Sequence, residues 1–354
     1  MPTLFDPLKV GDLTLRNRIL MAPLTRARSG VERTPGPLVA EYYAQRASAG
    51  LILSEATSVT PLGVGYADTP GIWSQAQVDG WKLTTEAVHK AGGLIFLQLW
   101  HVGRISDPVF LDGQSPVSAS SVAARGDVSL LRPKRPYPVP RPLSLAEIED
   151  VIEAYRRGAE NARRAGFDGV ELHGANGYLL DQFLQDSTNH RDDAYGGPIE
   201  NRARLMLAAV DAAISVFGPG RVGLHIAPRG DAHDMGDSDP LATFGYVARA
   251  AADRGVAFIC AREHLGDGRI GPQLKAIFGG TWIANEGFDL ASAEGVLAAG
   301  EADAVAFGKL FIANPDLPRR LASGAPLNDW NAATFYVPGP DGYTDYPALE
   351  TEAA

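Results

Sequence analysis

The sequence predicts a single α/β domain folded as a closed (β/α)8 TIM barrel. In a chain of 354 residues, short apolar runs alternate with helical stretches eight times, as they do when crossover helices join parallel strands. No Ser/Gly-rich linker divides the chain, so residues 1–354 are expected to form one domain. A chain of this length can bury roughly 75% of its unfolded surface, which is enough for one large core.

The barrel strands are placed on the apolar runs, and each is followed by a helical pattern. The expected strands are 19–25, 51–57, 94–100, 169–173, 222–227, 258–262, 282–286 and 304–309. The expected helices are 38–48, 75–91, 144–165, 198–217, 239–254, 271–278, 289–299 and 315–322. Start signals support two of them: Ser144 stands three residues before Glu147, and Pro315 opens the last helix.

Three further segments do not follow the β/α rhythm. Residues 1–18 precede the first strand and are expected to close the far end of the barrel as an N-terminal hairpin. Segment 101–143 carries seven prolines, which exclude a long regular helix, and its position after strand 3 predicts a long lid over the barrel mouth. The C-terminal tail 331–354 contains three tyrosines and is expected to be ordered.

Composition excludes several classes of function. There are 42 acidic against 32 basic residues, and the resulting net charge of −10 argues against a nucleic-acid or acidic-membrane partner. The chain starts without a charged segment and apolar run, and no run is long enough to span a membrane, so a cytoplasmic location is expected. With Cys260 as the only cysteine, a disulfide or cysteine-held cluster is excluded, no metal site is expected, and redox chemistry requires a borrowed cofactor.

In a parallel barrel, reactive groups collect where strands end, and polar residues stand at four such ends: Thr25, Glu55, Gln98 and the group from His173 to Tyr178. His173 and Asn176 can both donate a hydrogen bond to one oxygen. The phenol of Tyr178, with an ordinary pKa of about 10, can deliver a proton at neutral pH. This set suits activation of a carbonyl or nitro oxygen. The alternative is that His173 is a barrel histidine with satisfied bonds and that Tyr178 packs on a helix.

At these positions the chain resembles the old yellow enzyme family of flavin-dependent ene-reductases, which includes N-ethylmaleimide reductase-like proteins. The resemblance runs from residue 4 to about residue 347. The matching motifs are MAPLTR (21–26), EYYAQRAS (41–48), QLWHVGR (98–104), GFDGV (166–170), YGG (195–197), ENR (200–202), AFG (306–308), NPDL (314–317) and GYTDYP (342–347).

The resemblance implies a noncovalent FMN across the barrel mouth, with NAD(P)H as the hydride donor. Thr25 would bond the flavin O4 edge, Gln98 would hold the pyrimidine edge, and Pro23, Leu24 and Ala56 would line the ring. His173 and Asn176 would bind the substrate oxygen, and Tyr178 would protonate the α-carbon. Tyr66, Trp100 and Tyr343 match aromatic pocket positions, where a ring can instead simply shape the pocket and exclude water.

The phosphate of the cofactor is expected where the last two strands end, near Gly287, Gly308 and Lys309. The family commonly has Arg at position 309, and Lys offers a point charge in its place. Glu286 puts a carboxylate beside this anion site and would loosen the grip on phosphate unless it points outward.

The third departure from the family is His225, which stands where relatives present Arg to the flavin N1 edge. The charge at that edge thereby becomes dependent on pH, unless a nearby residue such as Arg229 compensates.

The sequence therefore predicts an FMN-dependent ene-reductase for small electrophilic alkenes: α,β-unsaturated carbonyls, imides or nitroalkenes. It is expected to act as a monomer or homodimer. Two alternatives stay open: a barrel that holds flavin or another ligand with little activity, and a non-redox phosphate-binding barrel. The choice between NADPH and NADH is open too, because no Gly-rich fingerprint marks the donor.

Overall fold

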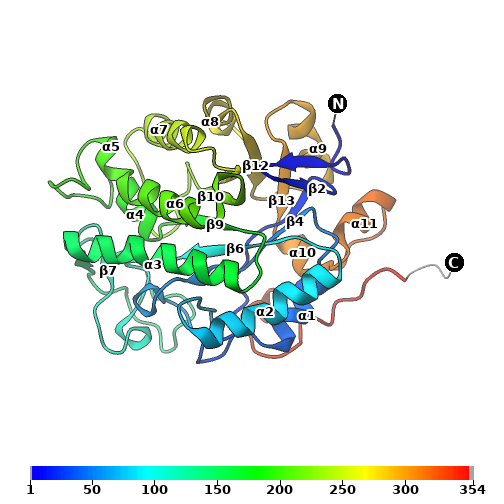
Figure 1. Cartoon of the computed structure of the whole chain (residues 1–354), viewed down its shortest axis with the longest axis horizontal. Helices are drawn as coiled ribbons and strands as arrows, with labels where there is room; N and C mark the ends of the chain where they lie inside the picture. Colours follow the sequence, from blue (N-terminus) through cyan, green and yellow to red (C-terminus); the bar gives the residue numbers. More distant parts are fainter. Residues whose placement is uncertain (1, 351–354) are drawn as a thin grey trace.

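The structure, a computed structural model, describes residues 2–350 and confirms the predicted (β/α)8 barrel. Its parallel strands pair in the order β4-β3-β13-β12-β11-β10-β9-β6, and pairing of β4 with β6 closes the ring. Figure 1 shows the strands in the interior with the helices around them. The barrel strands are β3 (Ile19–Met21), β4 (Leu51–Leu53), β6 (Ile95–Trp100), β9 (Gly169–Gly174), β10 (Val222–Ile226), β11 (Phe258–Arg262), β12 (Thr281–Asn285) and β13 (Ala304–Phe307).

The eight crossover helices lie where the sequence predicts them, and three shorter helices are added. The crossover helices are α1 (Pro37–Gln45), α2 (Gln75–Lys90), α3 (Leu145–Arg164), α6 (Arg204–Phe217), α7 (Pro240–Asp253), α8 (Gly271–Phe278), α9 (Leu290–Ala298) and α11 (Leu317–Ser323). The added ones are α4 (Leu179–Leu184), α5 (Ile199–Arg202) and α10 (Lys309–Ala313). Ser144 and Glu147 form the predicted capping box of α3, which satisfies backbone N–H groups that the first helical turn leaves free.

The first strand is shorter than the sequence predicts. It ends at Met21, because Ala22 makes the last bond to the neighbouring strand, through the Phe307 carbonyl, and Pro23 has no N–H to continue the ladder. Residues 22–25 therefore leave the sheet and turn toward the barrel mouth. The second strand likewise ends at Leu53 instead of Thr57.

The N-terminal hairpin forms as expected from β1 (Leu8–Val10) and β2 (Leu13–Leu15). Its turn packs on η3 (Pro219–Arg221), which leads into β10, and the Asp12 N–H donates to the Gly220 carbonyl at 3.2 Å. Gly11 has a left-handed φ of 51°, and a Cβ there would lie 2.1 Å from that carbonyl. The hairpin thus closes the barrel at the N-terminal ends of its strands.

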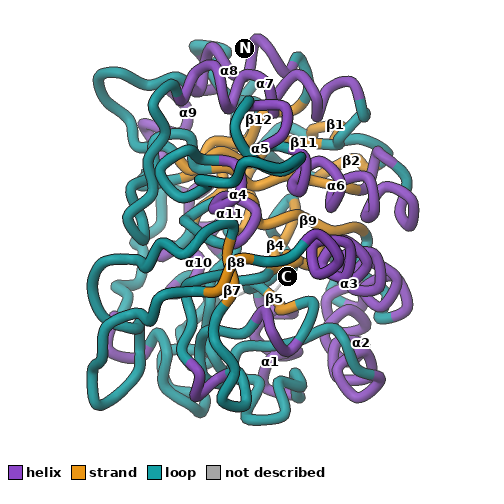
Figure 2. Tube along the Cα trace, turned by 90° about the vertical axis from the view of Figure 1, so that its left-hand side faces the viewer, coloured by secondary structure: helices purple, strands orange, loops and turns teal. Residues whose placement is uncertain are grey.

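The segment 101–143 has no long helix. It contains η2 (Pro108–Phe110) and two short strands, β7 (Val117–Ser118) and β8 (Arg141–Pro142), which pair in parallel. In Figure 2 these strands are small pieces within long loops. The buried Arg104 ties the segment to the loop after β10, because its guanidinium donates to the carbonyls of Val122 and His233 at 3.0 and 2.8 Å.

The tail after α11, as far as residue 350, returns to the barrel and packs against α1. It contains η4 (Ala332–Thr334), and the Tyr343 ring stacks on Tyr42 of α1 with centroids 4.0 Å apart. Among residues 2–350, no helix combines the length and apolar character needed to cross a bilayer.

Candidate active site

A cavity of about 730 Å³ opens at the C-terminal ends of the barrel strands. Its wall comes from the segment after β3, from the ends of β9 to β13, and from the tail. The predicted residues that line it are Pro23, Leu24, Thr25, His173, Asn176, His225, Gly287, Gly308 and Lys309. The barrel geometry therefore gathers residues that lie up to 286 positions apart, from Pro23 to Lys309, around one space.

The loop after β9 brings the three predicted catalytic residues together. His173 lies within β9, and Tyr178 is the residue directly before α4. Their rings meet edge to face with centroids 4.9 Å apart. Between them, Asn176 adopts a left-handed φ of 59°, a conformation that asparagine tolerates better than most residues. The Asp181 carboxylate fixes the turn by accepting the Gly177 N–H at 2.9 Å.

Burial sets the protonation states of this group. Loss of solvation, together with His225, Arg262 and His233, holds the pKa of His173 well below its usual range. Burial raises the pKa of Tyr178 above its usual range. At neutral pH the imidazole is therefore uncharged and the phenol keeps its proton.

Tyr178 stands in an aromatic cluster with Tyr66 and Trp100. Its hydroxyl lies 3.0 Å from that of Tyr66, and its ring lies 5.0 Å from that of Trp100. Trp100 also stacks on His173 with centroids 6.3 Å apart, and Ala56 belongs to the same buried cluster. The predicted pocket residues Tyr66 and Trp100 thus contact the predicted catalytic ones.

Several polar atoms under the cavity are buried without a hydrogen-bond partner in the described part of the chain. They are Nδ1 of His173, both ring nitrogens of His225 and Oε1 of Glu171. The other Glu171 oxygen, Oε2, accepts a hydrogen bond from Gln98 at 2.8 Å. The same oxygen lies 3.6 Å from Nδ1 of His225. Because buried polar groups are normally paired, this floor is suited to a ligand with both donors and acceptors.

Comparison with known proteins decides the family. Residues 3–328 match the family described as NADH:flavin oxidoreductase / NADH oxidase. The chain belongs to this family.

Both curated relatives and solved structures of this flavin oxidoreductase family match over almost the whole chain. The chain is 44% identical to 12-oxophytodienoate reductase 1 of Oryza sativa subsp. japonica, over 98% of this chain and 93% of that protein. An old yellow enzyme homologue from Zymomonas mobilis is 45% identical with a TM-score of 0.96, over 98% of this chain and all of that one. Morphinone reductase in complex with tetrahydroNAD is 47% identical with a TM-score of 0.95, over 99% and 98% of the two chains. The old yellow enzyme resemblance is therefore confirmed.

The cofactor of this flavin oxidoreductase is FMN, and its hydride donor is a nicotinamide nucleotide. The residues present fit FMN, because His225 lines the cavity with both ring nitrogens unpaired, and the pyrimidine edge of a flavin carries donors and acceptors that such nitrogens can meet. At the opposite end, Lys309 offers a cation beside Gly287 and Gly308. Gly287 has a left-handed φ of 75°, so its backbone can approach a ligand closely.

Glu286 does not act as a free carboxylate at the phosphate end. Its carboxylate is paired with the Arg262 guanidinium at the end of β11, and its second oxygen lies 3.3 Å from His264. Arg262, which the sequence did not single out, thus neutralises the Glu286 carboxylate. The one feature of the sequence that could have pointed to Arg262 is that a cationic residue stands at the last position of a barrel strand.

Arg229 does not supply a cation to the flavin edge. Its guanidinium donates to the Asp267 carbonyl at 2.8 Å and lies 3.6 Å from Glu263, and it does not line the main cavity. His225 does line that cavity, 5.6 Å from His173 between ring centroids. Cys260 is fully buried, and burial raises the pKa of its thiol well above the usual range.

Tyr343, which the sequence predicts near the substrate pocket, does not line the cavity. Its ring is fully buried behind the cavity wall, stacked on Tyr42 and covered by Arg28, whose guanidinium lies 4.2 Å from the ring centroid. Both faces of the ring are packed, while its hydroxyl is buried without a hydrogen-bond partner in the described part of the chain. From the same region, Trp330, Phe335 and Tyr336 line the cavity instead.

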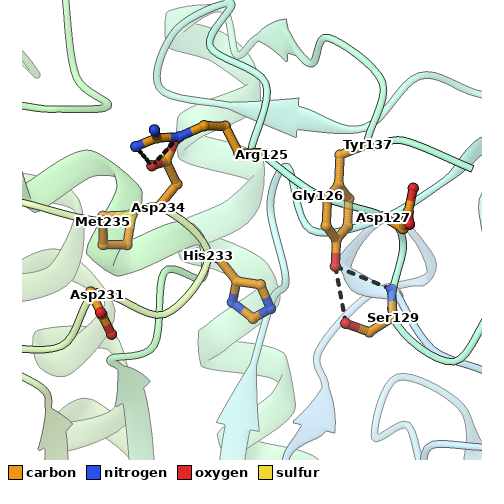
Figure 3. Close-up of a pocket in the computed structure, with 9 residues that line it drawn as sticks. All are labelled: Arg125, Gly126, Asp127, Ser129, Tyr137, Asp231, His233, Asp234 and Met235. Atoms are coloured by element: carbon orange, nitrogen blue, oxygen red, sulfur yellow. Dashed lines mark hydrogen bonds and ion pairs between the residues drawn. The ribbon is translucent and has the colours of Figure 1, made fainter.

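A second, outer pocket of about 460 Å³ lies between the segment 101–143 and the loop after β10. Figure 3 shows its lining, in which Arg125 pairs with Asp234 and Tyr137 faces Ser129. His233 links it to the active site, because its Nδ1 lies 2.7 Å from the Asn176 carbonyl and its ring lies 5.3 Å from Tyr178.

Proposed function

We propose that this protein is an ene-reductase in which His173, Asn176 and Tyr178 act on the activated C=C bond of an α,β-unsaturated carbonyl, imide or nitroalkene. Bound FMN supplies the hydride chemistry, taking the hydride from NAD(P)H. The observation that carries the proposal is that two hydrogen-bond donors, His173 and Asn176, line one cavity, and that the protonated phenol of Tyr178 packs edge to face on the His173 ring.

His173 and Asn176 bind the electron-withdrawing oxygen. An uncharged imidazole and a side-chain amide each offer an N–H, and both donors draw charge toward the oxygen as it develops in the transition state. Tyr178, on the other side of His173, gives its proton to the α-carbon. Tyr66 and Trp100 exclude water from that proton transfer.

The remaining predicted residues hold the cofactor. Pro23, Leu24 and Ala56 would pack against the flavin ring, Thr25 would bond its O4 edge, and Gln98 and His225 would meet its pyrimidine edge. This assignment is supported by the places of Thr25 and His225 on the cavity wall and by the unpaired nitrogens of His225.

All of these residues come from one chain, so a monomer suffices for activity and a homodimer is compatible with it. The net charge of −10 and the unpaired, buried Cys260 support a small-molecule enzyme of a reducing compartment such as the cytoplasm, without nucleic-acid or membrane partners.

The function is tested by spectroscopy and turnover of the purified protein. We expect a yellow protein that oxidises NADPH or NADH faster when 2-cyclohexenone is added under anaerobic conditions, with cyclohexanone as the product. A protein that is colourless and does not quench the fluorescence of added FMN would instead favour the non-redox phosphate-binding barrel. Bound flavin without enone-dependent oxidation would favour a ligand-holding barrel.

Lys309→Ala is expected to raise the Kd for FMN about tenfold or more, because a charge-assisted hydrogen bond of about 1.5–3 kcal/mol to the phosphate is lost. Quenching of FMN fluorescence by apoprotein measures this Kd. Lys309→Arg should bind FMN at least as well as the wild type, and Lys90→Ala on the exposed face of α2 is the matched control. A Kd unaffected by Lys309→Ala would remove Lys309 from the phosphate site.

The affinity of the oxidised enzyme for 2-cyclohexenone is expected to change by less than about twofold between pH 6.5 and pH 8. Burial holds the pKa of His173 well below its ordinary value of about 6.5, so the imidazole stays neutral throughout this range. Titrations followed by flavin absorbance measure the affinity. An affinity that climbs steadily as the pH falls would mean that His173 gains a proton in this range.

A further inference from the structure

The Arg262 guanidinium lies across the barrel mouth and joins three strand ends. Arg262 is the last residue of β11, and its Nη1 donates to Oδ1 of Asn176 in the β9 loop at 2.8 Å. The rest of the guanidinium faces the Glu286 carboxylate just after β12. Its side chain is 37% exposed, so it lies at the wall of the cavity, where a ligand can reach the groups around it.

This contact decides which end of the Asn176 amide faces the cavity. Arginine only donates hydrogen bonds, so the amide must present its oxygen to Arg262. Rotation of the amide by half a turn would place its NH2 group against the guanidinium, and two donors would then face each other. In the observed orientation, Nδ2 makes no hydrogen bond within residues 2–350 and is free to donate to a ligand.

The backbone of Asn176 is held as firmly as its side chain. Its carbonyl lies 2.7 Å from Nδ1 of His233, and its left-handed φ of 59° is followed by Gly177 with a φ of 74°. A Cβ at Gly177 would lie 2.8 Å from the Ala232 carbonyl, so the loop cannot shift outward. The backbone of Asn176 is thus fixed, and the part of the residue whose orientation must still be set is the side-chain amide.

Arg262 is itself anchored by a strained residue. Glu286 has a left-handed φ of 108°, a conformation that is unfavourable for a non-glycine residue. Surrounding structure maintains this conformation, and its result is a carboxylate that faces Arg262 and His264.

We propose that Arg262 is a positioning residue that orients the Asn176 amide, so that its NH2 group donates to the substrate oxygen beside His173. The inference rests on the proposed function of Asn176. Arg262 and Glu286 then take part in substrate binding, although no sequence motif marks them. Arg262 acts through Asn176 and does not bind the substrate itself.

The test is a double-mutant cycle on ligand affinity. Arg262→Met is expected to raise the Kd of the oxidised holoenzyme for 2-cyclohexenone about tenfold or more, because the amide is no longer held with its donor toward the oxygen. In the Asn176→Ala background, the same change should have little effect, since the group that Arg262 orients is gone. A residue with only a structural role would weaken binding equally in both backgrounds.

Three further variants complete the test. Arg262→Lys keeps a charged donor and should recover part of the affinity, and Glu286→Gln should weaken binding in the same direction as Arg262→Met, but less. Arg229→Met removes a neighbouring arginine that does not contact Asn176, and it should bind the enone as the wild type does. FMN content of each variant, measured by absorbance, shows whether the holoenzyme is intact.

Equal effects of Arg262→Met with and without Asn176 would overturn the inference, as would wild-type affinity in an Arg262→Met holoenzyme. If Arg262→Met loses FMN, the cycle is run with Arg262→Lys and with Glu286→Gln. The inference is then overturned if each of these variants changes the Kd for the enone equally in the wild-type and Asn176→Ala backgrounds. The proposed function fails separately, through a wild-type protein that does not reduce the enone at all.

Discussion

Tyr178→Phe is expected to slow reoxidation of the reduced enzyme by 2-cyclohexenone by about 10²-fold or more, the usual contribution of a positioned general acid. The phenol of Tyr178 belongs to the ring that packs on His173, and burial raises its pKa so that it is fully protonated at neutral pH. Phenylalanine keeps the ring, and with it the contacts to His173 and Trp100. The affinity for the enone and the rate of reduction by NAD(P)H should therefore change little.

Rapid mixing under anaerobic conditions separates these steps, because reduction by the nicotinamide and reoxidation by the enone are measured one at a time. Tyr66→Phe is the matched control, since its hydroxyl lies 3.0 Å from that of Tyr178 and is also buried. It should slow reoxidation far less than Tyr178→Phe does. Unchanged reoxidation in Tyr178→Phe would transfer the acid role to water or to Tyr66, and the double variant would distinguish these two.

The barrel and most of the site could be predicted from the sequence because both depend on short-range rules. Eight alternations of apolar run and helical pattern admit few other folds, and parallel strands must end on one face. Residues at or just beyond the ends of strands, such as Thr25, His173 and Lys309, therefore gather there. Their positions follow from backbone topology and need no knowledge of side-chain direction.

The features that the sequence did not predict depend on side-chain direction and on distant packing. Glu286 was expected to disturb the phosphate site, but a left-handed backbone turns its carboxylate to Arg262. Tyr343 was expected at the pocket, but it packs on Tyr42, which lies 301 positions earlier in the chain. No local pattern encodes either contact, because each partner comes from another part of the barrel.

A buried cation, Arg46, holds α10 against α1. Its side chain is fully buried at the end of α1, with the guanidinium 3.7 Å from the Tyr42 ring centroid, and it forms no ion pair within residues 2–350. Its nitrogens donate to the carbonyls of Phe311 and Ile312, both at 2.8 Å. These are carbonyls of the last turn of α10, which lack a partner inside the helix, so Arg46 caps the helix that begins with Lys309.

Arg46→Met should therefore lower the free energy of unfolding by about 3 kcal/mol or more, because each buried carbonyl left without a donor costs about 1–3 kcal/mol. Urea unfolding at a fixed FMN concentration measures the loss. Arg249→Met on the exposed face of α7 is the control, since Arg249 makes no hydrogen bond or ion pair in the described structure and its removal should cost little. FMN should also dissociate faster from Arg46→Met, because Lys309 loses the support of its helix.

A variant as stable as the wild type would show that water or Tyr42 replaces the lost donors, and that α10 is held by its apolar contacts alone.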